Sequence, residues 1–154
     1  MIDVIINLHN AAPDDETRIL KWRNMPYIYE AGFSQQPVEP EAHHAWFTER
    51  LNSPFCKMFI ISCGGQAIGQ IRFDFQYRRG RSEDNWIVSV YIVKKFTGKG
   101  YGSAAIKLAC QTMNKFYPGE RIVAEFLPQN ERSKKAFRKA RFRVAGKDKM
   151  VYIG

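Results

Sequence analysis

The sequence has few cysteines and no long apolar run. Cys56, Cys63 and Cys110 are odd in number and form no Cys-x-x-Cys pair, which argues against a structural zinc site and against a disulfide framework. We therefore expect free thiols in a reducing compartment. No apolar run approaches the roughly 18 residues that a membrane-spanning helix needs, and residues 1–15 lack the pattern of a secretion signal. These absences predict a cytoplasmic protein with no membrane partner and no bound metal.

Acidic residues are also scarce. The chain has 15 Asp and Glu against 24 Lys and Arg, and its net charge of +9 predicts an anionic partner, such as nucleic acid, a phosphorylated small molecule or a membrane surface. Residues 132–143, "RSKKAFRKARFR", hold seven of these basic residues and no acid. Phe137 and Phe142 stand among the charges as core anchors would, so we expect the charge on one exposed helix face and a partner other than nucleic acid.

The length and the apolar content of the chain are typical of a single globular domain. The chain has 154 residues, of which 45% are apolar and 14% aromatic, so we expect one domain over residues 1–154. Residues 26–39 have no clear period and predict a long loop that could shape a pocket. Apolar periodicity predicts helices over 16–24, 40–51, 103–116 and 131–139, the first of them capped by Asp14 or Asp15. It predicts strands over 3–8, 57–63, 66–77, 85–93, 121–127, 141–146 and 149–153. Turn residues predict a hairpin at Gly64 and Gly65 and a polar loop over 78–84.

The segment 94–110, "KKFTGKGYGSAAIKLAC", places glycines at 98, 100 and 102 between a predicted strand and a predicted helix. Such a turn aims unpaired backbone N–H groups at one point, where the helix dipole adds about half a positive charge. Glycine permits the positive φ angles that this requires, and Lys95 and Lys99 add mobile charge. The segment predicts a phosphate site, with a solvated turn as the alternative. It lacks the Gly-Lys-Ser/Thr ending of a nucleoside-triphosphate loop.

Two motifs carry a resemblance to the general N-acetyltransferase (GNAT) superfamily. "VKKFTGKGYGSAA" resembles the family's coenzyme A loop, [Q/R]-x-x-G-x-G/A, with Lys95, Gly98 and Gly100 at its fixed positions. "AEFLPQNERSKKAFRKARF" resembles the fourth motif of the family through Asn130, Ser133, Phe137 and Phe142. The predicted element order is similar to that of the family, so the resemblance covers essentially the whole chain. "WRN" at 22–24, "HHAWF" at 43–47 and "GQIRFD" at 69–74 resemble the branch with pseudaminic-acid-type amino-sugar and ribosomal-protein N-acetyltransferases.

The resemblance implies an α+β fold, a single GNAT-like domain with a mixed, mostly antiparallel central sheet flanked by helices and a V-shaped split between the two central strands. Acetyl-CoA, the implied acetyl donor, would lie in this split. The pyrophosphate would rest on the amides of 98–103, and the backbone of Ile92 and Val93 would pair with the pantetheine arm and polarise the thioester. The implied coenzyme-binding residues are Ile92, Val93, Lys95, Phe96, Thr97, Gly98, Lys99, Gly100, Tyr101, Gly102, Ser103, Asn130, Ser133, Lys134 and Phe137, while Arg132, Lys134 and Lys135 would either meet the ribose phosphate or form a solvated face.

The same resemblance implies one catalytic residue, Glu125, which matches the strand glutamate that acts as base in ribosomal-protein acetyltransferases. The alternative for Glu125 is a strand-edge carboxylate paired with Lys or Arg. The chain departs from the family at three positions, with Phe137 in place of the usual tyrosine acid, Ile87 in place of a second glutamate, and Arg141 in place of the glycine before Phe142. Substitutes for the missing groups are Tyr152, Ser89, His43 and His44, each with a structural role as the alternative.

Arg72 and Asp74 are the expected acceptor-binding residues, because alternation places both on one strand face; a salt-bridged sheet face is the alternative. A lysine amine with a pKa near 10.4 costs roughly 4.6 kcal/mol to deprotonate at pH 7, whereas an α-amine near 8 costs about 1.4 kcal/mol. Sparse acid and base groups thus favour a small acceptor with an amine of modest pKa, foremost a nucleotide-linked amino sugar. A protein amino terminus is the first alternative, and a non-catalytic nucleic-acid-binding module on the same scaffold is the second. Monomer and homodimer are both left open.

Overall fold

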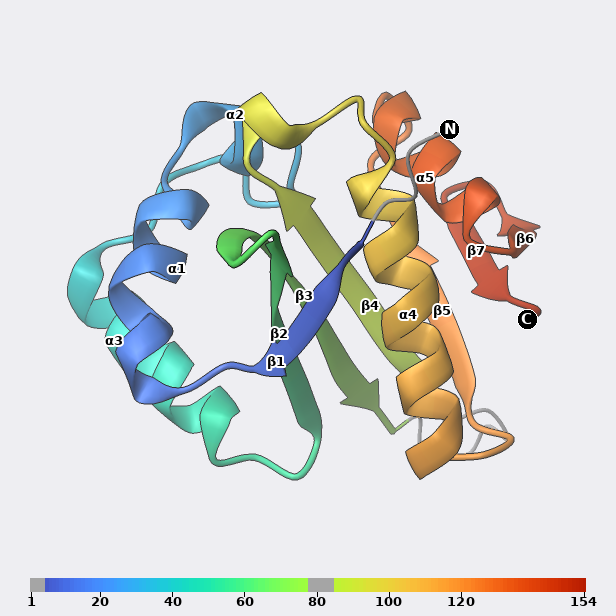
Figure 1. The fold of residues 1–154 in the computed structure, drawn as a ribbon, viewed down its shortest axis with the longest axis horizontal. Coiled ribbons are helices and arrows are strands. Elements are labelled where there is room, and N and C mark those ends of the chain that lie inside the picture. The colour runs from blue at the N-terminus through green and yellow to red at the C-terminus, as the bar shows by residue number, and fades with distance from the viewer. Residues whose placement is uncertain (1–4, 78–84) are drawn as a thin grey trace.

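The computed structural model describes residues 5–77 and 85–154, so the predicted loop over 78–84 and residues 3 and 4 of the first predicted strand lie outside the described residues. The described residues form one seven-stranded sheet in the order β1-β2-β3-β4-β5-β7-β6 (Figure 1). The strands are β1 (Asn7–Asn10), β2 (Cys56–Cys63), β3 (Gln66–Gln76), β4 (Asn85–Ile92), β5 (Arg121–Glu125), β6 (Phe142–Gly146) and β7 (Lys149–Tyr152). The helices are α1 (Glu16–Arg23), α2 (Pro26–Tyr29), α3 (Pro40–Leu51), α4 (Tyr101–Phe116) and α5 (Glu131–Lys139), with 3₁₀ turns at Pro13–Asp15 and Lys94–Phe96.

A split in the sheet opens between its two central strands. β4 and β5 are parallel neighbours, whereas the other strand pairs are antiparallel. Pairing between β4 and β5 ends at Val88 and Ala124, but β4 continues to Ile92, where it still pairs with Gly69 of β3. One edge of β4 is therefore open over its last residues. This arrangement confirms the expected α+β fold, in which a mixed, mostly antiparallel sheet splits between its two central strands.

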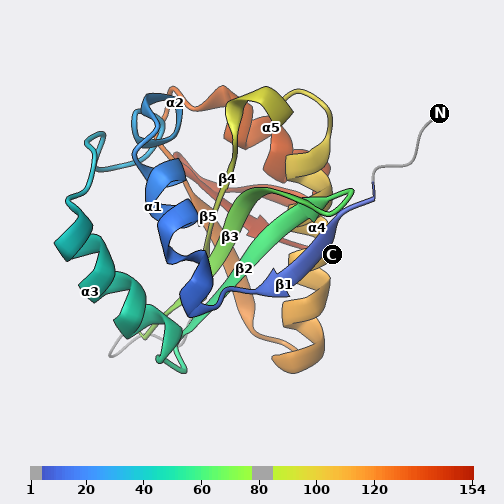
Figure 2. The same ribbon diagram turned by 60° about the vertical axis from the view of Figure 1, so that its left-hand side comes forward.

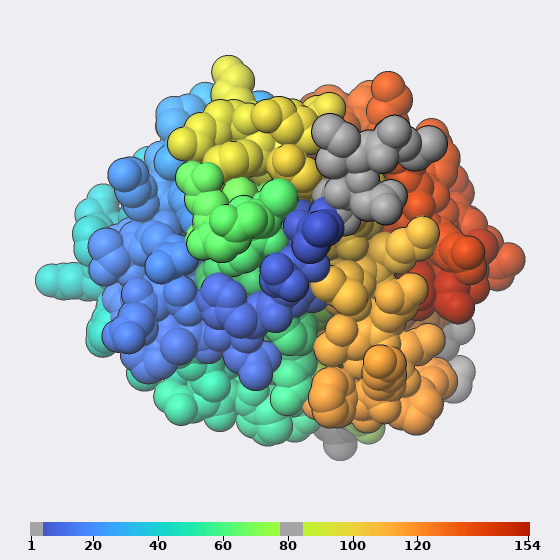
Figure 3. Space-filling view, viewed as in Figure 1, coloured from blue at the N-terminus to red at the C-terminus, as the bar shows by residue number. Residues whose placement is uncertain are grey.

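Two apolar clusters hold the helices to the two faces of the sheet. α4 presents Ala105, Ile106, Ala109, Cys110 and Met113 at helical spacing to one face, where they pack with Phe73, Trp86 and Phe137. α1, α2 and α3 cover the other face around Ile19, Trp22, Phe47 and Ile60, as the turned view shows (Figure 2). Each fully buried Ile, Phe or Met side chain of these clusters contributes about 1.5–3 kcal/mol of transfer free energy. In the space-filling view, α4 lies at the surface beside β1 (Figure 3).

Most elements lie where the sequence predicts them. The helix over 40–51, the hairpin at Gly64 and Gly65 and the helix over 131–139 are confirmed, and Cys56, Cys63 and Cys110 are free thiols. Among the described residues, no helix is long and apolar enough to cross a membrane.

The expectation of a strand over 3–8 is wrong in position. The strand is Asn7–Asn10, because pairing with Phe59–Ser62 of β2 defines it, and Ile5 before it is 70% exposed. α4 begins at Tyr101 rather than at 103, because Gly100 takes a left-handed conformation (φ 85°) at the N-cap. The predicted loop over 26–39 contains the short helix α2, which starts at Pro26.

Candidate active site

A cavity of about 710 Å³ lies at the split of the sheet. β3 and the open end of β4 form its wall, the turn 97–103 and the first turns of α5 line one end, and residues from α1, α3 and the segment 27–38 line the other. Its volume falls within the range of roughly 300–1,000 Å³ that is typical of small-molecule sites. The segment that the sequence predicts to be a pocket-shaping loop does line the cavity, through residues such as Tyr27, Phe33 and Val38.

The glycine turn brings free backbone amides to the cavity. Gly98 and Gly100 have positive φ angles of 77° and 85°, and a Cβ built on either would meet no atom within 4 Å. The amide of Thr97 donates to Lys94 and that of Ala104 to Gly100, but over 98–103 no amide has a carbonyl acceptor in the described part of the chain. These amides stand at the amino terminus of the 16-residue helix α4, whose dipole favours an anion. The local geometry is that of a phosphate cradle.

Eight of the fifteen residues that the resemblance assigns to the coenzyme line this cavity. They are Ile92, Thr97, Gly98, Gly100, Gly102, Ser103, Asn130 and Ser133. The Asn130 side chain accepts a hydrogen bond from the Ser133 amide (3.1 Å), which caps α5, and donates one to the Ala31 carbonyl (3.4 Å). This side chain therefore fixes the start of α5 against the segment that covers the cavity.

The remaining seven do not line the cavity. The Val93 amide donates to the Ile68 carbonyl (2.8 Å), and the Lys134 ammonium donates to the Pro128 carbonyl (2.8 Å). Phe137 is 3% exposed and packs against Phe126 and Phe142 in the core. Lys95, Phe96, Lys99 and Tyr101 also do not line the cavity; the Lys95 ammonium lies 5.2 Å from the centre of the Phe96 ring, and a hydrogen bond with Cys63 raises the pKa of Tyr101.

Basic residues of α5 line the same cavity as the glycine turn. Arg132, Lys135 and Lys139 line it, while the rest of the helix is anchored through Phe137. The Arg132 guanidinium lies 4.1 Å from the centre of the Tyr27 ring, a cation–π contact that holds it at the rim. Part of the positive face predicted over 132–143 thus borders the cavity.

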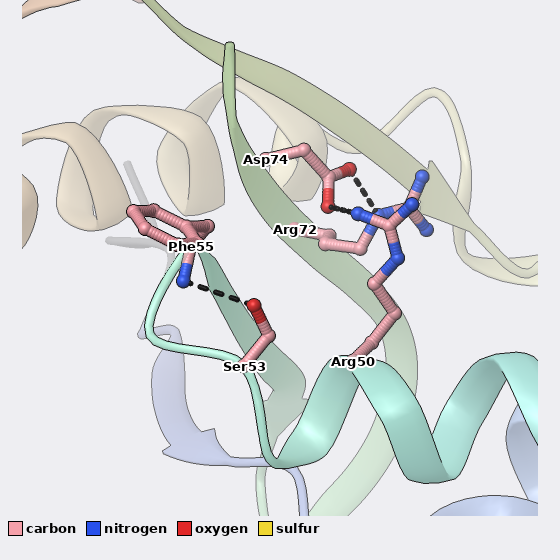
Figure 4. A network of polar contacts seen from close by, with 5 residues as sticks. All are labelled: Arg50, Ser53, Phe55, Arg72 and Asp74. Carbon is pink, nitrogen blue, oxygen red and sulfur yellow. Dashed lines mark hydrogen bonds and ion pairs between the residues drawn. The ribbon is translucent and has the colours of Figure 1, made fainter. Parts of the chain in front are cut away.

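On the opposite side, Arg72 is held by two neighbours. Its Nε donates to Asp74 Oδ2 at 2.7 Å, and Arg50 Nη1 donates to Asp74 Oδ1 at 2.6 Å (Figure 4). The Arg72 guanidinium also lies 4.9 Å from the centre of the Trp46 ring. Arg72 lines the cavity, but Asp74 does not. Of the two expected acceptor-binding residues, Arg72 faces the cavity, and Asp74 orients the Arg72 side chain.

Sequence reasoning missed two polar residues beside Arg72. Gln70 and Tyr91 face each other across β3 and β4, and both line the cavity. Gln70 Nε2, the Tyr91 hydroxyl and both ring nitrogens of His43 are buried with no hydrogen-bond partner in the described part of the chain. Burial raises the pKa of Tyr91 and lowers that of His43, so we expect a protonated phenol and a neutral imidazole at pH 7. The alternation in "GQIRFD" gave a signal for Gln70, whereas no local pattern marks Tyr91.

Glu125, the expected base, ends β5 at the opening of the split. Ala124 pairs with Val88 of β4, so the next residue, Glu125, lies beside Ser89. Ser89 is the first residue of β4 without a partner on β5. Strand pairing places Val123, Ile87 and Asp74 on one sheet face, and alternation adds Glu125 and Arg72 to that face. Ser89 lines the cavity and Glu125 does not.

The other expected substitutes in proton transfer are spread over the fold. The His44 ring binds Glu16 through Nδ1 at 2.8 Å, away from the cavity lining. Tyr152 packs against Phe142, and burial raises its pKa. Ser89 and His43 are the members of this set that line the cavity.

Comparison with known proteins identifies the family. The sequence model described as "Acetyltransferase (GNAT) domain" matches residues 6–143. No curated protein matches the chain. Among solved structures, the aminoglycoside acetyltransferase AAC(6')-Ib with coenzyme A and kanamycin is 16% identical, with a TM-score of 0.80 over 96% of this chain and 92% of its own. Another structure of that enzyme contains acetyl-CoA.

Two further structures have similar folds. RimL, a ribosomal L7/L12 alpha-N-protein acetyltransferase with coenzyme A, is 14% identical, with a TM-score of 0.79 over 96% of this chain and 93% of its own. Spermidine N-acetyltransferase from Vibrio cholerae, with coenzyme A and spermine, is 13% identical, with a TM-score of 0.75 over 95% and 91%. At these identities the likeness concerns the fold. Because the family model spans most of the sequence, this chain belongs to the GNAT acetyltransferase family, and it is an N-acetyltransferase with acetyl-CoA as donor.

Proposed function

We propose that this protein transfers an acetyl group from acetyl-CoA to a primary amine of a small acceptor, foremost a nucleotide-linked amino sugar. One observation carries the proposal: a single cavity joins the free amides of the glycine turn to the polar wall around Arg72. A donor at the first end and an acceptor at the second would meet along the open edge of β4.

At the donor end, residues 98–103 would hold the coenzyme's pyrophosphate through their amides. Support comes from their free N–H groups and from the open space beside Gly98 and Gly100. Acetyl-CoA supplies an acyl group activated as a thioester. The Ile92 amide would donate a hydrogen bond to the acyl oxygen, because the Val93 amide is turned towards Ile68 and alternation turns that of Ile92 towards the split.

Glu125 would take the proton from the acceptor's ammonium group, directly or through water. Glu125 lies beside Ser89 in the register of the sheet, on the same sheet face as Arg72, and this position supports the role. A thiolate with a pKa of about 8.5 leaves with little help, so the chemistry does not require an acid at position 137. This fits a chain in which Phe137 is packed into the core.

The size of the cavity supports a small acceptor. A volume of about 710 Å³ is in the range of small-molecule sites, and the reacting ends of donor and acceptor would share it. Two structural neighbours were solved with small amines, kanamycin and spermine. An amino sugar also has an amine of modest pKa, which suits a site with a single expected base.

A protein amino terminus is the second candidate acceptor, and the fold of RimL favours it. An α-amine also loses its proton at modest cost. Residues 27–38 cover part of the cavity, so a protein acceptor would have to present an extended terminal segment.

Coenzyme A release, followed with a thiol reagent and checked by product mass, tests the proposal. The panel contains nucleotide-linked amino sugars, free amino sugars and amino-terminal peptides at equal concentration. We expect the highest kcat/KM for a nucleotide-linked amino sugar. Highest activity on peptides would replace it with the second candidate, and no acetylated amine in any arm would contradict both.

A further inference from the structure

We propose that Arg72, Gln70 and Tyr91 form an anion-binding subsite, so that the acceptor carries a phosphate or carboxylate group besides its amine. The proposal rests on the proposed function, because it assumes that the acceptor lies against this wall. It goes further by assigning a negative charge to the acceptor and by naming the residues that bind the charged group.

The three side chains converge on one part of the wall. Gln70 and Tyr91 are directly opposite each other in the β3–β4 register, and Arg72 lies two residues along β3 on the same face. All of them line the cavity. The Asp74 carboxylate and the Trp46 ring fix the Arg72 guanidinium, so this cation is oriented before a ligand arrives.

These side chains offer donors without acceptors. The Arg72 guanidinium is donor-only, and within the described part of the chain its two Nη groups bind no oxygen. Gln70 Nε2 and the Tyr91 hydroxyl are buried without a partner in that same part. Buried donors are costly to leave unpaired, and an anionic oxygen satisfies several at once.

The charge around the subsite is positive. The described lining contains Arg23, Arg72, Arg132, Lys135 and Lys139 and no Asp or Glu. The triad of Arg50, Asp74 and Arg72 has a net charge of +1, from two cations and one anion. Arg23 adds another positive charge, and its side chain is fixed by hydrogen bonds to the Gln36 carbonyl (2.9 Å) and the Ser34 hydroxyl (2.7 Å).

Both arginines act on the same phenol. Burial raises the pKa of Tyr91, and the positive charges of Arg72 and Arg23 each lower it by a smaller amount. Two acidic residues lie in this region: Asp74, whose carboxylate is bound by both Arg50 and Arg72, and Glu16, which raises the pKa of His43 and is itself bound by His44. A polycationic amine would therefore be repelled here, whereas an anionic one would be attracted.

Matched acceptors test the subsite by steady-state coenzyme A release. Glucosamine has no anionic group, glucosamine 1-phosphate carries a phosphate, muramic acid carries a carboxylate, and spermine is a polycationic amine. We expect wild-type kcat/KM to be at least about 10-fold higher for an anionic amino sugar than for glucosamine, with spermine poorest. The better of glucosamine 1-phosphate and muramic acid identifies the anion as phosphate or carboxylate.

Variants assign the effect to Arg72. Arg72→Gln should raise KM for the anionic sugars about 10-fold more than it raises KM for glucosamine, Arg72→Lys should fall between, and Tyr91→Phe should have a smaller effect. Arg138→Gln removes an equal charge from the exposed side of α5, outside the cavity lining, and should change nothing. Equal losses for glucosamine and its phosphate, or a preference for spermine, would overturn the subsite.

A binding measurement separates the subsite from the proposed function. With coenzyme A saturating, so that its own phosphate sites are filled, titration with inorganic phosphate should give heat and a rise in Tm that Arg72→Gln and Arg72→Lys reduce. This arm decides the question even where no amine is acetylated, which would contradict the proposed function alone. Phosphate binding that is unchanged in both Arg72 variants would refute the subsite.

Discussion

Ser89 and Glu125 stand level with each other on adjacent parallel strands, one residue beyond the last β4–β5 pair, Val88 and Ala124. The open part of the split therefore starts with a hydroxyl on one side and a carboxylate on the other. An amine that enters from the wall of Arg72 approaches on the sheet face to which Glu125 belongs. The register, rather than the identity of Glu125 alone, makes this residue the candidate base.

Glu125→Gln should slow acetyl transfer most at low pH. Below about pH 8 the acceptor amine is largely protonated and needs a base, and a positioned general base contributes about 100-fold or more. We expect a loss of roughly that size in kcat/KM at pH 7 and a smaller loss at pH 9, measured as a pH–rate profile. Glu41→Gln, on the exposed first turn of α3, is the matched control. An unchanged profile would exclude Glu125 as the base.

Gly100→Val should weaken coenzyme binding while the domain stays folded. A β-branched residue at φ 85° costs about 1–2 kcal/mol of strain, and its side chain would occupy the open space beside the free amides. We expect Kd for coenzyme A, measured by calorimetry, to rise at least about 10-fold. Gly119→Val carries the same strain at φ 82°, with no atom within 4 Å of its Cβ and outside the cavity lining. Equal affinity in the two variants would contradict the phosphate cradle.

Asp74→Asn should destabilise the protein and loosen Arg72. The Asp74 carboxylate accepts from both Arg50 and Arg72, and loss of these charge-assisted bonds at a partly exposed site should cost about 1–2 kcal/mol in urea unfolding. A double-mutant cycle with Arg50→Met should show a coupling of about 1 kcal/mol or less. Additive free energies would indicate that the Arg50–Asp74 pair contributes nothing.

His43→Gln should flatten the dependence of stability on pH. Burial holds the pKa of His43 below 6.5, so its neutral form contributes stability that is present above pH 6.5 and is lost as the pH falls through the lowered value. The wild type should lose up to about 1.4 kcal/mol per pH unit from this residue in acid, and the variant should not. Phe47→Leu, a packing change beside His43, should lower stability by a similar amount at every pH. Identical slopes in wild type and His43→Gln would contradict the assignment.

The donor end of the site could be predicted because its signal is local. Gly98 and Gly100 need only their own backbone freedom and the start of α4 to present free amides. Short-range apolar periodicity likewise predicts the helices over 16–24 and 40–51. The bounds of β1 could not be predicted, because pairing with β2 sets them. Local apolar residues such as Ile5 carry no information about that pairing.

The acceptor end depends on contacts between distant segments. Tyr91 meets Gln70 only through the β3–β4 register, and Arg23 reaches the same region through the packing of α1. Lys134 shows the reverse case, because its side chain bends to the Pro128 carbonyl instead of facing the cavity. Positions on a helix face could be read from the sequence, but the direction of a long flexible side chain could not.

Beyond Val88, β4 has a hydrogen-bonding edge that no other strand of residues 5–77 and 85–154 occupies. An unpaired edge at the rim of a sheet invites association with strands of other proteins. Here residues 89–92 of β4 line a cavity together with residues of the segment 27–38, so a ligand that enters the cavity can reach this edge. The fold thereby offers unpaired backbone hydrogen-bonding groups to a ligand within a cavity at the centre of the sheet, rather than at an outer edge strand.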